Sequence, residues 1–234
     1  MCVMEYIKKN CYLSTNCKLD KCNYINNNDI CIRFFKIDYL LDKSLLSEYS
    51  KKDIKLILDQ DGTDRNEYEE LSNIQKKIKQ WVEAGNNLYL CSSTPGNGKT
   101  SWAIKLLKSY ILSIWPESTL GCKALFINVP KFLIELKSNI SKKSEYIKYI
   151  NDNVLEADLV IWDDIATKSA TEFEHEHLLS LIDNRLFNKK SNIFTSNILP
   201  NNLSILIGDR LASRVNSSTV IEFKGKDKRG VEQD

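Results

Sequence analysis

The sequence predicts an α/β fold, in which a parallel sheet of five strands is flanked by helices. Two observations lead to this prediction. From residue 88 onward, short apolar segments alternate with amphipathic ones, as expected for a parallel sheet that is covered on both faces. The first apolar segment also runs directly into a glycine-rich turn and then into a segment of helical period. A strand, a turn and a helix in this order are the context in which phosphate-binding loops occur.

Each element of the fold follows from the same alternation. The apolar segments predict strands at 88–92, 123–129, 158–162, 192–196 and 219–223. The segments between them predict helices at 100–114, 131–139, 144–156, 174–188 and 206–215. One more helix precedes the sheet, because apolar residues from Tyr68 to Trp81 recur at spacings of three and four, and Gly85 is expected to end it.

The overall composition is that of a soluble globular protein. The chain has 234 residues, which allows one full domain and a small appendage. It is 42% hydrophobic and 27% charged, and no segment approaches the roughly 20 apolar residues that cross a bilayer, so we expect no membrane association. The N-terminus lacks the apolar run of a signal peptide, which favours the cytoplasm and reduced cysteines. A net charge of +2 neither requires nor excludes a nucleic-acid partner.

Residues 93–100, STPGNGKT, have the pattern of a loop that binds nucleotide phosphates. Gly96 and Gly98 allow backbone N–H groups to turn toward a phosphate, and the start of the next helix adds a favourable dipole. Lys99 is expected to reach the β- and γ-phosphates of ATP, and the Thr100 hydroxyl to bind Mg2+. The usual pattern begins with glycine, whereas this loop begins with serine. The predicted ATP-binding residues of the loop are Thr94, Pro95, Gly96, Asn97, Gly98, Lys99, Thr100 and Ser101.

Two carboxylates follow the third predicted strand. Asp163 and Asp164 come directly after an apolar run, where paired acids repel each other unless a cation is present. We therefore expect Asp163 to hold Mg2+ and Asp164 to orient the water that attacks the γ-phosphate. A solvated strand end that caps the next loop is the alternative. Asn197 follows the next strand and is a candidate for positioning the same water, although its sequence context is also ordinary turn chemistry.

Four local motifs give the sequence a resemblance to a known family. They are TPGNGKT, LVIWDDI, TSN and GDRLASRV, in this order along the chain. With them, residues 66–230 resemble the AAA+ ATPases, and among these the DnaC/DnaI-type replicative helicase loaders and the related IstB transposition ATPases. The resemblance implies an AAA+ P-loop core with strand order 5-1-4-3-2 and little or no C-terminal lid. It also implies an ATPase whose turnover is slow and depends on assembly.

The resemblance assigns roles to three arginines. Arg214, in the motif GDRLASRV, corresponds to the arginine finger, which reaches the ATP of a neighbouring subunit. Arg210 is the second candidate for this role. Arg229, in the segment FKGKDKRG, corresponds to the nucleotide-binding arginine called sensor 2. Without the family, the first two would be interpreted as surface arginines paired with acids, and the third as part of a basic tail.

The resemblance also implies a function in DNA replication. The leading hypothesis is an ATP-dependent loader that delivers a hexameric replicative DNA helicase to single-stranded DNA during replication initiation or restart, in a bacterium or a phage. The implied partners are this helicase, single-stranded DNA and further copies of the chain, which associate through ATP sites at subunit interfaces. An IstB-type helper ATPase that acts with a transposase on DNA is the alternative. A third hypothesis is an adaptor that binds ATP but hardly hydrolyses it.

The N-terminal part of the chain is rich in cysteine. Four of its thiols are enough for a tetrahedral Zn2+ site, and the resembled loaders carry a zinc-binding N-terminal module that touches the helicase. They are Cys11, Cys17, Cys22 and Cys31. Their wide spacings also fit ordinary reduced cysteines in a small module whose core is the apolar stretch 32–41. We predict a helicase-interacting module at 1–45, a linker and connecting helix at 46–85, and an ATPase domain at 86–234.

Overall fold

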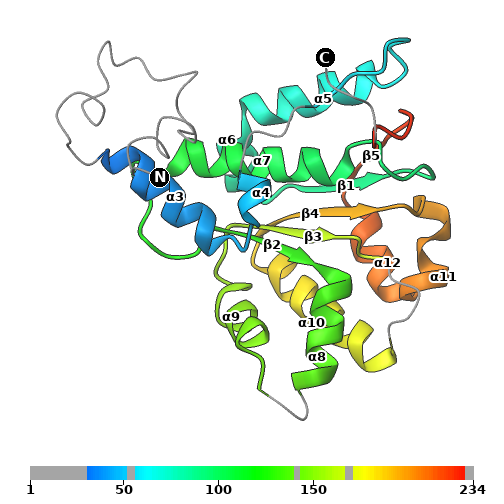
Figure 1. Ribbon diagram of the computed structural model, residues 1–234. Helices are drawn as coiled ribbons and strands as arrows, with labels where there is room; N and C mark the ends of the chain where they lie inside the picture. The colour runs from blue at the N-terminus through cyan, green and yellow to red at the C-terminus, as the bar shows by residue number, and fades with distance from the viewer. Residues whose placement is uncertain (1–30, 52–55, 140–142, 167–170, 230–234) are drawn as a thin grey trace, which may run out of the picture.

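The computed structural model describes residues 31–51, 56–139, 143–166 and 171–229. They form a parallel sheet in the order β2-β3-β4-β1-β5, with helices on both faces (Figure 1). The predicted order 5-1-4-3-2 is confirmed, and each strand begins and ends within one residue of its predicted position. The strands are β1 (Asn87–Cys91), β2 (Ala124–Asn128), β3 (Leu159–Asp163), β4 (Ser191–Ser196) and β5 (Thr219–Glu222).

The register of the sheet brings several strand ends together at one edge. Asp163 at the end of β3 lies opposite Asn128 at the end of β2. Cys91 at the end of β1 lies opposite Ser196 at the end of β4. Because parallel strands end at the same edge, the loop after β1 and the acids after β3 lie close together, where open α/β sheets bind their ligands.

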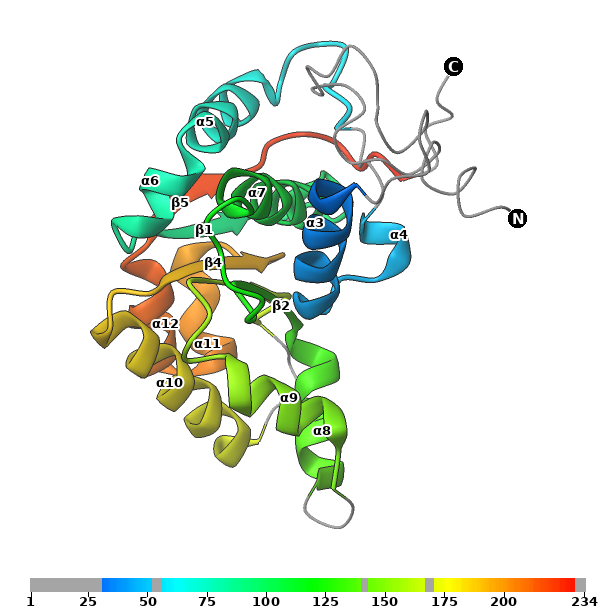
Figure 2. The ribbon, with the colours of Figure 1, turned by 90° about the vertical axis from the view of Figure 1, so that its left-hand side faces the viewer.

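Alternate side chains of each strand face two apolar clusters, one on each side of the sheet. In β1, Leu88 and Leu90 belong to one cluster, while Tyr89 and Cys91 belong to the other. Figures 1 and 2 show the sheet between the two helical layers that cover these clusters. The first layer contains α3 (Ile32–Lys43), α5 (Arg65–Lys76), α6 (Ile78–Glu83) and α7 (Lys99–Ile114). The second contains α8 (Val129–Asn139), α9 (Glu145–Asn153), α10 (Glu172–Phe187), α11 (Leu203–Ile207) and α12 (Asp209–Asn216). The connecting segments hold α4 (Glu48–Lys51) and a 3-10 helix, η1 (Pro200–Asn202).

Two of the predicted helices are each split into two. The segment predicted as one helix at 206–215 forms parts of α11 and α12, because Gly208 between them adopts φ 77°, a conformation outside the helical region that glycine permits. The helix predicted before the sheet is interrupted at Lys77, whose N–H donates to the carbonyl of Ile74. The predictions of single helices were therefore wrong. Apolar residues keep their helical spacing on both sides of each break, so the apolar pattern alone gave no sign of the interruption.

Helix α3 packs into the same core as the sheet. Its buried residues Ile37 and Leu40 belong to the cluster that α7 covers. The Ser44 carbonyl, just beyond α3, accepts a hydrogen bond of 2.9 Å from the Phe126 N–H of β2. Ile32, by contrast, is 72% exposed. The apolar stretch that was interpreted as the core of the N-terminal module is therefore divided between the main core and the surface.

A fully buried arginine ties the start of β4 to the end of α9. Arg185 of α10 donates to the carbonyls of Val154 and Ala157, at 2.6 and 2.7 Å, and to that of Ser191 at 2.6 Å. Its Nε donates to Asn192 Oδ1 at 2.7 Å. Burial lowers the pKa of Arg185 to about 9, so the guanidinium is still charged at neutral pH. Neutral oxygen acceptors satisfy this charge and fix the position of β4 beside β3.

Candidate functional site

The predicted phosphate-binding loop connects β1 to α7. Gly96 and Gly98 have φ values of 75° and 100°, which are left-handed conformations that other residues rarely adopt. The Ser92 hydroxyl accepts hydrogen bonds from the Thr94 N–H at 2.9 Å and from the Asn97 side-chain amide at 2.7 Å. Helix α7 begins directly after the second glycine. The loop therefore combines a glycine-dependent turn with a helix N-terminus, as an anion-binding loop requires.

The Lys99 ammonium lies inside this loop. The residue is only 6% exposed, and Nζ donates to the Thr94 carbonyl at 3.3 Å and to Asn97 Oδ1 at 3.0 Å. Burial lowers the pKa of Lys99, and the nearby Asp164 and Asp163 oppose this effect. A cation that is already out of water attracts a phosphate more strongly than an exposed one, because the local dielectric constant is low.

Thr100 and Asp163, which were predicted as Mg2+ ligands, are in direct contact. Thr100 Oγ1 donates to Asp163 Oδ1 at 2.8 Å, and Thr195 Oγ1 donates to the same oxygen at 2.8 Å. Asn128 Nδ2 lies 3.5 Å from Asp163 Oδ2. Asp163 is 4% exposed, yet its hydrogen-bond partners here are neutral groups. A buried carboxylate beside a hydroxyl and the phosphate loop fits the oxygen ligands that Mg2+ prefers.

Asp164 follows this carboxylate in a left-handed backbone conformation. Its φ is 55°, which is uncommon outside glycine and is frequent at functional sites. Its N–H donates to Thr195 Oγ1 at 3.0 Å. Burial raises the pKa of Asp164, the charge of Asp163 raises it further, and Lys99 lowers it. A carboxylate with a raised pKa accepts a proton from water more readily than an ordinary aspartate does.

The β4 residue that contacts both acids is Thr195, which is not among the predicted site residues. A signal for it was present, because Thr195 is a polar residue in a strand whose residues are all buried, and a buried hydroxyl needs a partner. Asn197, predicted as a catalytic residue, is exposed and lies one residue beyond the end of β4. Its role in positioning water remains a prediction.

The segment after β5 brings Arg229 beside the phosphate loop. The N–H of Lys228 donates to the Gly96 carbonyl at 3.0 Å. The guanidinium of Arg229 pairs with Asp227 through two nitrogens, with Nη2 2.7 Å from Oδ2 and Nε 3.1 Å from Oδ1. This pairing lowers the pKa of Asp227 to about 2. Arg229 is therefore close to the loop, and Asp227 holds its guanidinium.

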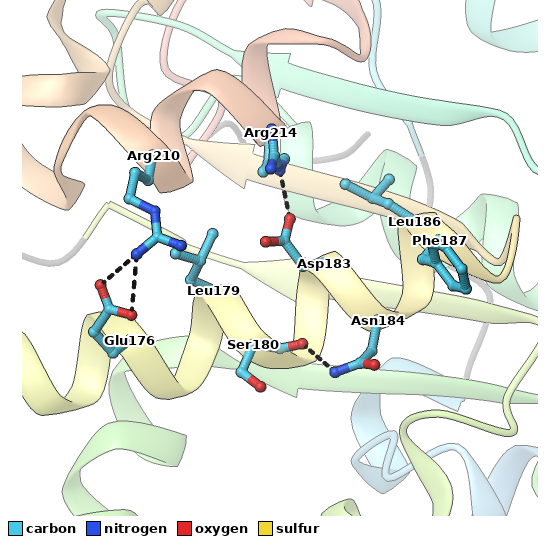
Figure 3. Close-up of a pocket in the computed structure, with 9 residues that line it drawn as sticks. All are labelled: Glu176, Leu179, Ser180, Asp183, Asn184, Leu186, Phe187, Arg210 and Arg214. Atoms are coloured by element: carbon cyan, nitrogen blue, oxygen red, sulfur yellow. Dashed lines mark hydrogen bonds and ion pairs between the residues drawn. The ribbon is translucent and has the colours of Figure 1, made fainter.

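Arg210 and Arg214 lie on a different surface, between α10 and α12 (Figure 3). Arg214 pairs with Asp183, and Arg210 Nη1 lies 3.4 Å from Glu176 Oε1. The arginine side chains are 74% exposed for Arg210 and 49% exposed for Arg214. An open hollow of about 620 Å³ lies beside them. Its apolar wall is formed by Leu179, Leu186 and Phe187.

The zinc prediction falls mostly outside the described residues. Cys11, Cys17 and Cys22 lie there, and Cys31 is a partly exposed free thiol just before α3. Among the residues that the structure describes, no three His, Cys, Asp or Glu side chains are placed to hold a metal ion. No helix in the described ranges has the length and apolarity needed to cross a membrane.

Comparison with protein families matches the chain to the family described as IstB-like ATP binding protein. The match covers residues 52–217, which extend from the segment before α5 to the end of α12. The comparison with curated proteins found no match.

Solved structures share this fold at low sequence identity. The crystal structure of the DnaC helicase loader is 18% identical, with a TM-score of 0.56, over 69% of this chain and 90% of that one. The structure of DnaI is 20% identical, with a TM-score of 0.54, over 76% of this chain and 88% of that one. The replication initiator DnaA, bound to AMPPCP and single-stranded DNA, is 18% identical, with a TM-score of 0.53, over 82% of this chain and 51% of that one. At these identities the likeness is one of fold.

Proposed function

The chain belongs to the IstB-like ATP-binding protein family and is an ATPase with an AAA+ core, and on that premise we propose that it loads a hexameric replicative DNA helicase onto single-stranded DNA. The observation that carries this proposal is the agreement in fold with the DnaC helicase loader, which extends over 90% of that chain. DnaI agrees over 88% of its length, whereas DnaA agrees over only 51%. The loaders therefore correspond to this chain almost as whole structures.

Residues 94–101 bind the triphosphate of ATP in this proposal. The ammonium of Lys99 leaves its two acceptors within the loop and donates to the β- and γ-phosphates. Thr100 and Asp163 would hold Mg2+, which when bound neutralises charge on the phosphates. Thr195 keeps the Asp163 carboxylate oriented through its hydroxyl.

Hydrolysis then uses groups from two copies of the chain. Asp164, whose pKa is raised by burial, orients the attacking water and accepts its proton, and Asn197 is a second contact for that water. Arg214 of a second copy donates to the γ-phosphate as negative charge develops on it, with Arg210 as the second candidate. Arg229 binds the nucleotide of its own chain. Turnover therefore depends on self-association.

Contact with the helicase is made by the N-terminal module in this proposal. The module is predicted at residues 1–45, with a linker at 46–85 and an ATPase domain at 86–234, and within the module α3 packs against the core of the ATPase domain. Zn2+ would be held by four thiolates and would stabilise the module. These are the thiolates of Cys11, Cys17, Cys22 and Cys31.

Complex formation with a hexameric replicative helicase tests the proposal. The protein is mixed with the helicase of its own source, with and without ATP and Mg2+, and analysed by size-exclusion chromatography with light scattering. We expect a stable complex whose stoichiometry depends on nucleotide. A variant lacking residues 1–30 retains α3, and thus the core, but should lose the complex. No complex under any nucleotide condition would contradict the loader function.

The family match favours a second function, because IstB-like proteins include the resembled transposition ATPases. In that case the partner is a transposase bound to DNA. The same chromatography distinguishes the two functions. A complex with a transposase encoded next to this protein, together with no complex with the helicase, would establish the transposition function.

Two substitutions separate ATP binding from turnover and so test the adaptor hypothesis. Lys99→Ala should abolish both, because it removes the cation inside the phosphate loop. Asp164→Asn should keep ATP binding and lower turnover about 100-fold, since the amide cannot accept the proton of water. Lys105→Ala on the same helix is the control and should change neither. If the Asp164→Asn variant loads the helicase as efficiently as the unchanged protein does, the chain acts as a nucleotide-gated adaptor.

A further inference from the structure

The segment that follows β5 crosses two parts of the molecule that are far apart in sequence. Residues 223–229, called the C-terminal strap here, contact the phosphate loop on one side and residues 57–68 on the other. Figures 1 and 2 both show the red end of the chain passing beside the cyan segment that leads into α5. The strap therefore connects the ATP site to residues 57–68, none of which is a predicted site residue.

Hydrogen bonds fasten the strap to the end of β1 and to the phosphate loop. The Phe223 N–H donates to the Cys91 carbonyl at 2.8 Å, and the Asn97 side-chain amide lies 3.4 Å from the Phe223 carbonyl. Further along, the Lys228 N–H donates to the Gly96 carbonyl at 3.0 Å. These contacts join the strap to the end of β1 and to Gly96 and Asn97 in the middle of the loop.

Acids in the turn before α5 and in the first turn of α5 hold the other side of the strap. The Lys224 N–H donates to Glu67 Oε1 at 2.8 Å, and the Lys226 N–H donates to Asp59 Oδ2 at 2.9 Å. Gly225 lies between them with little space, since a Cβ there would come within 2.9 Å of Asp59 Oδ2. The strap is thus closely packed against this turn.

Lys228 connects the two sides. Its N–H bonds to the loop, while its side chain, 11% exposed, pairs with the fully buried Asp64. The ammonium also donates to the Ile57 carbonyl and, at 3.2 Å, to the Tyr68 hydroxyl. Burial alone would lower the pKa of Lys228, but its hydrogen bonds to Asp64 and Tyr68 outweigh burial and raise it. The charged form is therefore the one that the fold stabilises.

Tyr68 extends this connection to the helix that begins at the loop. Its ring lies edge-on to that of Trp102 of α7, with centroids 5.1 Å apart. The Lys228 ammonium lies over the Tyr68 ring, 4.8 Å from its centroid. The centre of the phosphate loop and the helix that follows it are thus linked, directly at Gly96 or through Tyr68 and Trp102, to the buried pair of Lys228 and Asp64.

We propose that Lys228 is a positioning residue of the ATP site, which holds the strap on the Gly96 carbonyl and keeps the phosphate loop in its binding conformation. A loop with two glycines in left-handed conformations loses much conformational entropy when it is ordered, and the strap meets part of that cost before the nucleotide arrives. The proposal rests on ATP binding by the phosphate loop and is independent of whether the partner is a helicase or a transposase.

Lys226 provides a matched control. It lies two residues earlier on the same strap, and its ammonium pairs with Asp61 at 2.7 Å. Its side chain is 74% exposed, and the atoms it contacts belong to the acidic turn. Lys226→Met removes a lysine of the strap without removing the side chain that links the loop to the buried acid.

The test is the affinity for ATP, measured by calorimetric titration with Mg2+, together with steady-state turnover. Lys228→Met should weaken ATP binding about tenfold and raise KM in parallel, while turnover at saturating ATP stays within about twofold, because the reacting groups are unchanged. Lys228→Arg should recover much of the affinity, and Lys226→Met should bind ATP as the unchanged protein does.

Thermal unfolding of each variant separates this effect from loss of the fold. If Lys228→Met does not fold, the double variant Asp64→Asn with Lys228→Met removes both charges of the buried pair and should show the same weakened binding. Normal ATP affinity in folded Lys228→Met, alone or combined with Asp64→Asn, would overturn the proposal. Failure of the unchanged protein to bind ATP would overturn the ATP site itself. Whether a complex with the helicase forms in the absence of nucleotide is measured independently of both results.

Discussion

The phosphate loop and the α10–α12 face hold their cations in opposite ways. At the loop, the residue Lys99 is 6% exposed and the Lys228 side chain is 11% exposed, and both make hydrogen bonds within the folded chain. On the α10–α12 face, the side chains of Arg214 and Arg210 are 49% and 74% exposed, and the acids that pair with them are also partly exposed. The first region is assembled when the chain folds, whereas the second presents cations to the outside.

This difference has an energetic consequence. An ion pair between exposed side chains contributes about 0–1 kcal/mol, so Arg214 can exchange Asp183 for another anion at little cost. A buried cation such as Lys228 leaves an uncompensated acid behind if it is removed, which costs several times more. In the proposed mechanism, folding therefore prepares one half of the ATP site and association of copies supplies the other.

Arg214→Ala should produce the largest effect on turnover, and an unchanged turnover would contradict the proposed division of the ATP site between two copies. We expect turnover of the assembled protein to fall about 1,000-fold, because a guanidinium no longer neutralises charge on the γ-phosphate. ATP affinity should stay unchanged, since the loop keeps its own cations. Arg210→Ala on the same face is the control and should lower turnover less than Arg214→Ala does. Steady-state ATPase assays and ATP titrations measure both quantities.

A mixing experiment tests whether this arginine acts on a neighbouring copy. Arg214→Ala retains the phosphate loop, and Lys99→Ala retains the arginine. Each variant alone should be nearly inactive, but the mixture should regain part of the turnover, because one copy binds ATP and the other supplies the guanidinium. No recovery in the mixture would show that Arg214 does not act across an interface.

Arg185 is an arginine with no exposed surface, and it serves as a structural counterpart to Arg214. Arg185→Leu leaves the carbonyls of Val154, Ala157 and Ser191 without their donor, and we expect unfolding free energy to fall by about 3 kcal/mol. Urea denaturation measures this loss. Arg214→Ala in the same assay should change stability by less than about 1 kcal/mol. Equal effects of the two substitutions would remove the distinction between structural and exposed arginines.

The groups that could be predicted from the sequence are those whose chemistry lies in contiguous motifs. The strands, the glycine loop and the paired acids are each readable from a few adjacent residues. The contact between Thr100 and Asp163 also follows, because both lie at the carboxyl edge of a parallel sheet. The strand order came from the family resemblance.

The remaining contacts depend on register and on pairs that are distant in sequence. Thr195 reaches Asp163 only because β4 pairs with β3 in this register. Lys228 and Asp64 are 164 positions apart, and no sequence pattern indicates that they form a pair. An arginine in a helix is normally exposed, so the burial of Arg185 is visible only when the ends of α9 and β4 are placed around it.

Asp183→Asn should have the smallest effect, and it tests whether the pairing on the α10–α12 face is exchangeable. Asp183 is bound to Arg214 in the isolated chain, so in the proposed mechanism a phosphate of the neighbouring copy's ATP replaces it before the arginine acts. The pair is half exposed and contributes at most about 1 kcal/mol. Removing it can therefore strengthen the binding of Arg214 to a neighbouring phosphate by at most about fivefold. We expect the protein concentration that gives half-maximal ATP turnover to fall two- to fivefold. Glu176→Gln, the control, should shift it less, since Glu176 holds Arg210. A higher concentration requirement for Asp183→Asn would instead mean that Asp183 orients the arginine toward the neighbouring nucleotide.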